Sequence, residues 1–140
     1  MDYIVIDGDA AVFEDQFGAA MIEVQDGTMV GSGFASVDGA AVCIEADIAA
    51  VIVGPVPYST SSHSQKGAGL LIIDSLADDQ LATQTTTNGE AVILVGSKFN
   101  AKFQVAVPAI QPGSPPQPDL TPDYAGYGVF DSQNDLVRGT

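Results

Sequence analysis

The chain has 140 residues, a mass of 14.4 kDa and 46% hydrophobic residues, which is enough apolar material for one packed core and excludes disorder throughout. Its 4 Lys and Arg residues stand against 18 Asp and Glu, a formal net charge of −14. A field of that sign repels phosphate backbones and anionic lipid headgroups, so the composition excludes nucleic-acid binding.

The beginning of the sequence indicates how the chain is made. It has no basic start followed by a long apolar stretch, and no run of about 18 apolar residues occurs anywhere. We expect synthesis in the cytoplasm without a signal peptide, no stable membrane insertion, and export by a route that needs no cleaved leader.

Four Asp-Gly or Asn-Gly pairs separate short apolar runs. Both central residues of a type I′ turn need a positive φ, which Gly adopts freely and Asn or Asp tolerate. Each pair therefore predicts a tight turn between antiparallel strands. The pairs are Asp7-Gly8, Asp26-Gly27, Asp38-Gly39 and Asn88-Gly89, and the strands expected around them are residues 3–6, 20–24, 35–37, 42–45 and 50–53.

The middle of the chain contains breaks in this pattern. Pro55 and Pro57 cannot donate ladder hydrogen bonds, so the sheet is expected to end or bend there. Residues 58–69 are rich in Ser, Thr and Gly and predict an exposed loop that carries the single histidine, His63. The order Ser75-Leu76-Ala77-Asp78 has the form of a capping box and predicts a helix of about two turns over residues 75–82.

Three further strands are expected at residues 70–74, 91–95 and 98–107. The last shows the clearest alternation: Phe99, Ala101, Phe103, Val105 and Val107 occupy one face. Lys98 and Lys102 point to the other face, where they form a solvated surface, guard an edge, or contact an acidic partner.

Proline density marks a boundary near residue 110. Pro108, Pro112, Pro115, Pro116, Pro118 and Pro122 fall within fifteen residues, which favours extended polyproline II over packing. We expect a body over residues 1–110 and a proline-rich tail over residues 111–140 that straps the body with Tyr124, Tyr127 and Phe130. The predicted fold class is mainly β: a compact body of short antiparallel strands with tight Gly-containing turns, one short helix and this tail.

Few side chains point to chemistry. Carboxylate pairs such as Asp7 with Asp9 occur where turns favour Asp, so no catalytic residue is assigned. Cys43 and His63 could contribute to one zinc site, but four ligands are needed and a carboxylate such as Glu45 or Asp47 would have to join them. The alternative is a buried thiol and a solvated imidazole with no cofactor, and this alternative favours a structural or binding role.

A set of strand and turn segments resembles the PAAR-like spike-tip proteins of contractile injection systems. These are Val42-Cys43-Ile44-Glu45-Ala46-Asp47, Gly54-Pro55-Val56-Pro57-Tyr58, Gly67-Ala68-Gly69-Leu70-Leu71-Ile72-Ile73, Ala91-Val92-Ile93-Leu94-Val95-Gly96-Ser97 and Val107-Pro108-Ala109. The resemblance covers residue 4 to about residue 109. It departs from the family at the metal clamp, for which the better-known members use several His and a Cys.

The resemblance implies a non-enzymatic role. The protein would cap a trimeric β-helical spike, VgrG-like or phage-spike-like, and sharpen it for membrane puncture by type VI secretion or by a phage-tail-like particle that delivers it outside the cell. An effector would be a further partner. Two alternatives stand beside this function: a small β-sandwich binding or adhesion module, and a metal-dependent enzyme that uses Cys43 and His63.

Overall fold

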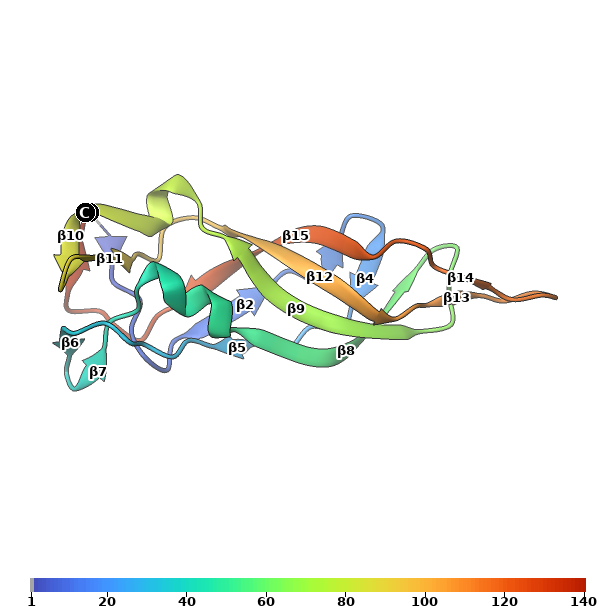
Figure 1. Ribbon diagram of the computed structural model, residues 1–140, viewed down its shortest axis with the longest axis horizontal. Coiled ribbons are helices and arrows are strands. Elements are labelled where there is room, and N and C mark those ends of the chain that lie inside the picture. The colour runs from blue at the N-terminus through green and yellow to red at the C-terminus, as the bar shows by residue number, and fades with distance from the viewer. Residues whose placement is uncertain (1) are drawn as a thin grey trace.

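The computed structural model describes residues 2–140, and its main element is a curled antiparallel sheet of eight strands (Figure 1). Four neighbouring strands of nine residues each form its centre. In spatial order the strands are β3 (Gln16–Phe17), β4 (Ala20–Ile22), β8 (Ile52–Thr60), β9 (Gly67–Ser75), β12 (Phe99–Val107), β15 (Asp123–Asp131), β2 (Ala10–Phe13) and β5 (Gly27–Thr28). The mainly β fold class is confirmed.

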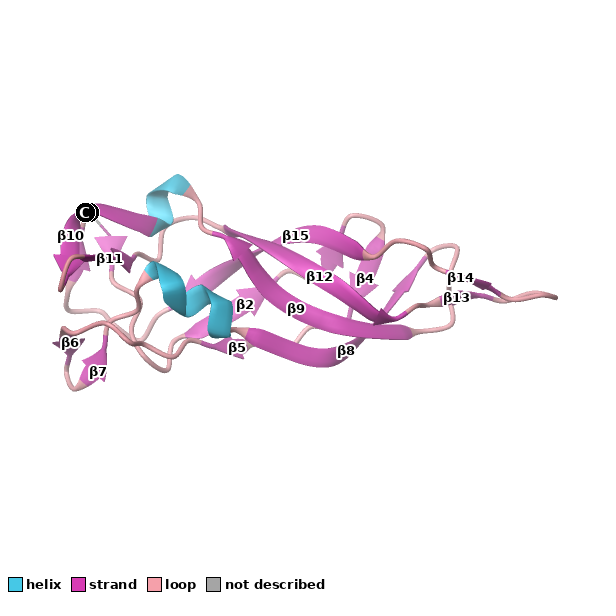
Figure 2. Cartoon of the chain, viewed as in Figure 1, coloured by secondary structure: helices cyan, strands magenta, loops and turns pink. Residues whose placement is uncertain are grey.

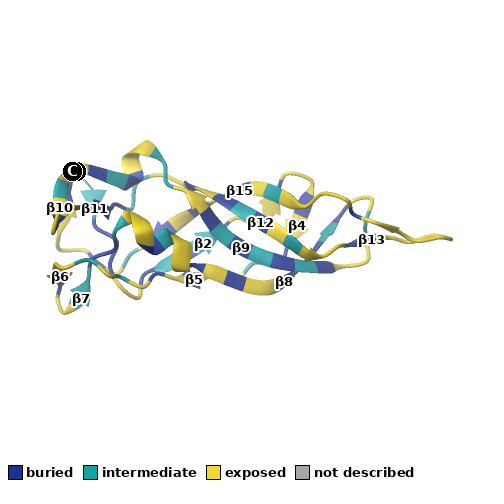
Figure 3. Ribbon diagram, in the orientation of Figure 1, coloured by how far each residue is buried: buried dark blue, intermediate teal, exposed yellow. Residues whose placement is uncertain are grey.

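The curl of the sheet encloses the larger core. A Cβ at Gly27 of β5 would lie 2.8 Å from Val51 Cγ1 and 3.0 Å from Val53 Cγ2, so the last strand returns to the start of β8. On the inner face Phe13 and Phe130 pack against Phe99, with ring centroids 5.5 and 5.0 Å apart. Buried residues alternate with intermediate or exposed ones along the long strands, as Figure 3 shows, because one face of each lines this core.

Four two-stranded pairs extend the sheet at its two ends. Three gather at a broad end: β1 (Asp2–Tyr3) with β16 (Arg138–Gly139), β6 (Ser36–Val37) with β7 (Ala40–Ala41), and β10 (Leu81–Thr87) with β11 (Glu90–Ile93). The fourth, β13 (Ile110–Gln111) with β14 (Gln117–Pro118), projects alone from the opposite end (Figure 1). The molecule therefore tapers from the three pairs to one hairpin.

The predicted helix over residues 75–82 is wrong. Ser75 is the last residue of β9, and only a 3₁₀ turn, η2 (Asp78–Gln80), precedes β10. The longer 3₁₀ helix η1 (Glu45–Ala50) lies between the strands expected at residues 42–45 and 50–53 (Figure 2). Gln80, which is fully buried, accepts a hydrogen bond from the Ala77 N–H at 3.0 Å and donates to the Val95 carbonyl at 3.2 Å. The local bond to Ala77 caps this single turn, and the tertiary bond to Val95 fixes the Gln80 side chain in the interior, so the chain continues as β10 rather than as a helix.

The tight-turn prediction is right for two of the four pairs. Asp38-Gly39 and Asn88-Gly89 join β6 to β7 and β10 to β11, with φ of 50° and 86° in the first and 49° and 83° in the second. Asp7-Gly8 makes a turn without a hairpin, and Gly27 lies inside β5. At Gly27 the glycine is needed for close approach to β8 rather than for a turn.

The prolines bend β8 without ending it, because its register with β9 shifts between Val53 and Val56 and the strand continues to Thr60. The exposed loop is accordingly shorter than expected and spans residues 61–66. The alternating strand is confirmed as β12, in which Phe99, Ala101 and Phe103 are buried. The buried face does not extend to Val107, which is exposed beyond a shift in the register with β9.

The chain after the prolines returns to the sheet. β15 pairs with β12 on one side and with β2 on the other, so the sheet runs across the boundary expected between residues 110 and 111. Residues 1–110 alone would leave both neighbours of β15 with unpaired edges.

Candidate functional site

Three backbone segments, residues 4–6, 42–44 and 92–94, meet at the broad end, where three hydrogen bonds join their central residues in a closed triangle. The Val5 N–H donates to the Ile93 carbonyl, the Ile93 N–H to the Cys43 carbonyl, and the Cys43 N–H to the Val5 carbonyl, each at 2.9 Å. All three side chains are fully buried in the larger core. Each segment thus contacts both of the others in the same way.

The residues beside this triangle repeat the cyclic order. Isolated bridges join Ile4 to Leu94, Ile6 to Val42 and Ile44 to Val92, so the last residue of one segment pairs with the first of another, and Leu94 returns to Ile4. Five of the six belong to a second apolar cluster that lies on the other side of the triangle from the larger core. The arrangement is an internal, approximate threefold symmetry within one chain.

Each segment follows a two-stranded pair, so three similar units are present. Ser36 pairs with Ala41 and Val37 with Ala40, while Thr86 pairs with Ala91 and Thr87 with Glu90, an offset of 50 residues throughout. In the third unit β16 and β1 form the pair, and the two ends of the described chain replace the turn. We call these units together the base: residues 132–139 with 2–9, residues 32–47, and residues 77–95.

Buried carboxylates hold two of the units in equivalent ways. The Ile6 N–H and the Ser132 hydroxyl donate to Asp9 Oδ2 at 2.8 and 2.6 Å, and the Gln133 N–H donates to Oδ1 at 2.9 Å. The Ile44 N–H and the Ser32 N–H donate to Asp47 Oδ2 at 2.8 and 3.1 Å, and the Ser32 hydroxyl donates to Oδ1. Because both carboxylates accept three hydrogen bonds, they position loops rather than face a substrate.

The base presents an acidic surface with isolated apolar side chains. Its exposed carboxylates include Asp7, Asp38, Glu90 and Asp135. Arg138 is the one Lys or Arg residue in the three units, and its guanidinium lies 4.4 Å from the centre of the Tyr3 ring. Phe34 and Leu136 are 87% and 74% exposed.

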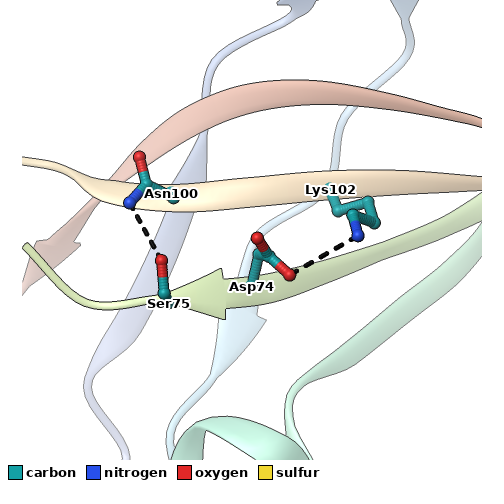
Figure 4. Close-up of polar contacts among 4 residues, drawn as sticks. All are labelled: Asp74, Ser75, Asn100 and Lys102. Carbon is teal, nitrogen blue, oxygen red and sulfur yellow. Dashed lines mark hydrogen bonds and ion pairs between the residues drawn. The ribbon is translucent and has the colours of Figure 1, made fainter.

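Two lysines lie on or beside the sheet instead: Lys102 is in β12, and Lys98 directly precedes that strand. Lys102 Nζ on β12 is 3.6 Å from Asp74 Oδ1 on β9, and Asn100 Nδ2 donates to Ser75 Oγ at 2.9 Å across the same two strands (Figure 4). Lys98 Nζ is 2.8 Å from Glu14 Oε2. On the face expected to be shared by Lys98 and Lys102, both ammonium groups thus contact carboxylates of neighbouring segments.

Cys43 and His63 lie in separate parts of the fold. Burial raises the pKa of the Cys43 thiol to about 12, and the charges of Asp47, Asp9 and Asp7 add to the rise, so the thiol stays protonated at neutral pH. His63 is in the β8–β9 loop, where its Nδ1 is 3.0 Å from Ser62 Oγ and 3.2 Å from Thr60 Oγ1. That loop lies toward the hairpin, while Cys43 belongs to the base (Figure 1).

Within residues 2–140 the structure brings together no group of three or more His, Cys, Asp and Glu side chains that could hold a metal ion. The candidate ligand Asp47 is already engaged by Ser32 and Ile44. The residues present at Cys43 and His63 therefore do not form a common zinc site in this geometry.

A buried polar cluster anchors the projecting hairpin. The Tyr58 and Tyr124 hydroxyls donate to Asp119 Oδ2 at 2.8 and 2.6 Å, and the Thr121 N–H donates to Oδ1 at 3.0 Å. The Tyr58 hydroxyl also accepts from the Ala109 N–H at 2.9 Å. The carboxylate thereby ties the return strand of the hairpin to β8 and β15.

The pKa values of this cluster reflect its hydrogen bonds. Burial disfavours the Asp119 carboxylate, but the hydrogen bonds from Tyr124, the Thr121 N–H and Tyr58 outweigh it and lower the pKa below its ordinary value. Burial is the largest cause that raises the pKa of Tyr58 to about 12, and Asp119 adds to it. The cluster therefore holds one charged carboxylate and two neutral phenols at neutral pH.

Comparison with known protein families matches residues 1–140 to the family described as contractile injection system spike tip protein. The chain belongs to the contractile injection system spike tip family. No curated protein matches this spike tip chain in sequence. In the part of the chain that the structure describes, no helix is long and apolar enough to cross a membrane.

The resemblance to spike-tip proteins that the strand and turn segments indicated is confirmed by this match. The approximate threefold symmetry of the base was not predicted from the sequence. A repeated sequence pattern could have revealed it, which Ser36 to Ile44 and Thr86 to Leu94 share. Each stretch begins with Ser or Thr, has Asp-Gly or Asn-Gly two residues later, and ends with Ala followed by three apolar residues.

Proposed function

We propose that this spike tip protein caps the end of a trimeric spike with its base and directs the β13–β14 hairpin away from the spike. The triangle of Val5, Cys43 and Ile93 carries the proposal, because it gives a single chain three similar units around one axis. A face with approximate threefold symmetry can make similar contacts with each of three identical chains. One tip would then bind three spike chains, VgrG-like or phage-spike-like.

The taper of the molecule supports this orientation, in which the base faces the spike and the β13–β14 hairpin points away from it. The base is the broad end, and the opposite end narrows to one hairpin that is anchored through the buried Asp119 (Figure 1). A stiff, narrow projection in front of a broad seat suits membrane puncture. Contraction of the apparatus would supply the energy, so the tip would act mechanically and without a reacting group, as part of an injection particle delivered outside the cell.

The stoichiometry can be measured on a co-purified complex. Co-expression with the spike protein of the same injection system, followed by light scattering, should give a mass of one tip and three spike chains. Equal numbers of tip and spike chains, or a stable homotrimer of the tip alone, would contradict the proposal.

The direction can be tested by blocking each end. Cys43 is fully buried, so Ser36→Cys in the base and Ser114→Cys in the hairpin each create one accessible thiol for a bulky maleimide–polyethylene glycol label. The label at residue 36 should prevent spike binding, whereas the label at residue 114 should leave it unchanged. The reverse pattern would show that the hairpin end faces the spike.

A further inference from the structure

The two most exposed apolar side chains of the base occupy equivalent positions. The Val42 N–H donates to the Ala35 carbonyl at 3.0 Å, and the Ile4 N–H donates to the Val137 carbonyl at 3.2 Å. Val42 and Ile4 are the first residues of their segments in the cyclic arrangement. The residues that precede Ala35 and Val137, Phe34 and Leu136, are therefore related by the approximate threefold symmetry.

The third unit has a polar residue at the same place. The offset of 50 that relates residues 36–41 to residues 86–91 places Gln84 in the position of Phe34. Gln84 is exposed, and its backbone N–H donates to the Thr140 carbonyl at 2.7 Å. Two of three equivalent positions thus carry a large apolar side chain, and one carries an amide.

We propose that Phe34 and Leu136 enter two of three identical apolar pockets around the axis of a trimeric spike, and that the third pocket lies opposite Gln84. The inference rests on the proposed function, because only a threefold partner offers the same pocket three times. The side chains that carry most of the binding energy in protein interfaces are those that fill well-packed, desolvated pockets on the partner.

Charge indicates the chemistry around those pockets. The three units contain ten Asp and Glu residues, of which Asp9 and Asp47 are buried, and the single cation Arg138. Asp38, Glu90 and Asp135 lie in the three different units and are exposed. A partner that complements this face has basic residues at the rim of each pocket, and such contacts weaken as salt is added.

The affinity of the complete chain for its spike trimer tests the inference. Phe34→Ala and Leu136→Ala should each weaken binding by about 10- to 100-fold, since each loses the burial of one large apolar side chain. Gln84→Leu should strengthen binding by about tenfold, because it fills the third pocket. Leu120→Ala is the matched control: Leu120 is 89% exposed but lies outside the base, so its loss should leave the affinity unchanged.

The outcomes separate the two proposals. If the wild-type chain binds no trimer at any salt concentration, the proposed function fails. If it binds, but Phe34→Ala and Leu136→Ala bind like Leu120→Ala, the pocket inference fails while the proposed function stands. A Gln84→Leu variant that binds no better than wild type would contradict the third pocket. Each variant alters an exposed side chain, and a thermal unfolding curve that matches wild type confirms its fold.

Discussion

Replacing Asp119 by Asn should loosen the projecting hairpin. The carboxylate accepts two tyrosine hydroxyls on Oδ2 and the Thr121 N–H on Oδ1. The amide of Asn has one acceptor oxygen, so in either orientation its NH₂ faces a group that now donates to Asp119. Hydrogen bonds to a charged group contribute about 1.5–3 kcal/mol each, and we expect Asp119→Asn to lower the free energy of unfolding by about 2–3 kcal/mol.

Urea and thermal unfolding at pH 7 measure this loss, which corresponds to about 6–9 °C in Tm for a chain of this length. Asp123→Asn is the control, because Asp123 is exposed and close in sequence. Tyr124→Phe removes one of the three donors and should cost about 1 kcal/mol. An Asp119→Asn variant within about 0.5 kcal/mol of Asp123→Asn would refute the reasoning.

The pH dependence provides a second check on the same carboxylate. Because the folded pKa of Asp119 is lower than its ordinary 3.8, its stabilisation is present above pH 3.8 and is lost as the pH falls through the folded pKa. The stability difference between wild type and Asp119→Asn should therefore be constant from pH 5 to 7 and shrink below about pH 4. A stability difference between the two proteins that increases as the pH falls would contradict the predicted direction of this pH dependence.

Three further predictions concern the core and the sheet surface. Gly128→Ala should lower the free energy of unfolding by about 1–3 kcal/mol in urea, because the new Cβ would lie 2.3 Å from Phe99 Cζ, and an unchanged stability would contradict this packing. The Cys43 thiol should not react with a disulfide reagent at pH 8 until urea unfolds the protein, and fast labelling of the native chain would show that it is accessible. Lys102→Gln should change the stability by less than about 0.5 kcal/mol, since its ion pair with Asp74 is partly exposed, and a larger loss in the same urea assay would reveal a stronger pair.

Long-range features of the sheet were the hardest to predict from the sequence. β12 was predictable because large apolar residues occupy alternate positions. β15 has the same alternation, but two of its inward positions are Gly126 and Gly128, beneath the rings of Phe17 and Phe99. A glycine contributes no apolar side chain to a periodic pattern, so the sequence assigns this strand to the proline-rich tail although its packing in the sheet depends on those glycines.

The structure of the base could also be predicted only in part from the sequence. Its turns at Asp38-Gly39 and Asn88-Gly89 were predictable from local chemistry, whereas their relation by threefold symmetry depends on a third unit split between the two ends of the described chain. Cys43 and His63 are candidate zinc ligands because a thiolate and an imidazole can bind zinc. The ligand chemistry of two side chains carries no information about the distance between them, and the structure places the two on different segments.

The unit of the base that pairs β1 with β16 joins residues that are synthesised at different times. Tyr3 and Arg138, which face each other in the pairing of β1 with β16, are 135 positions apart, so β1 leaves the ribosome long before its partner. Pairing across such a separation is slow and comes late in folding. A polypeptide released before residues 132–139 are translated would lack β16, so β1 would have no partner and one of the three units of the base would be incomplete.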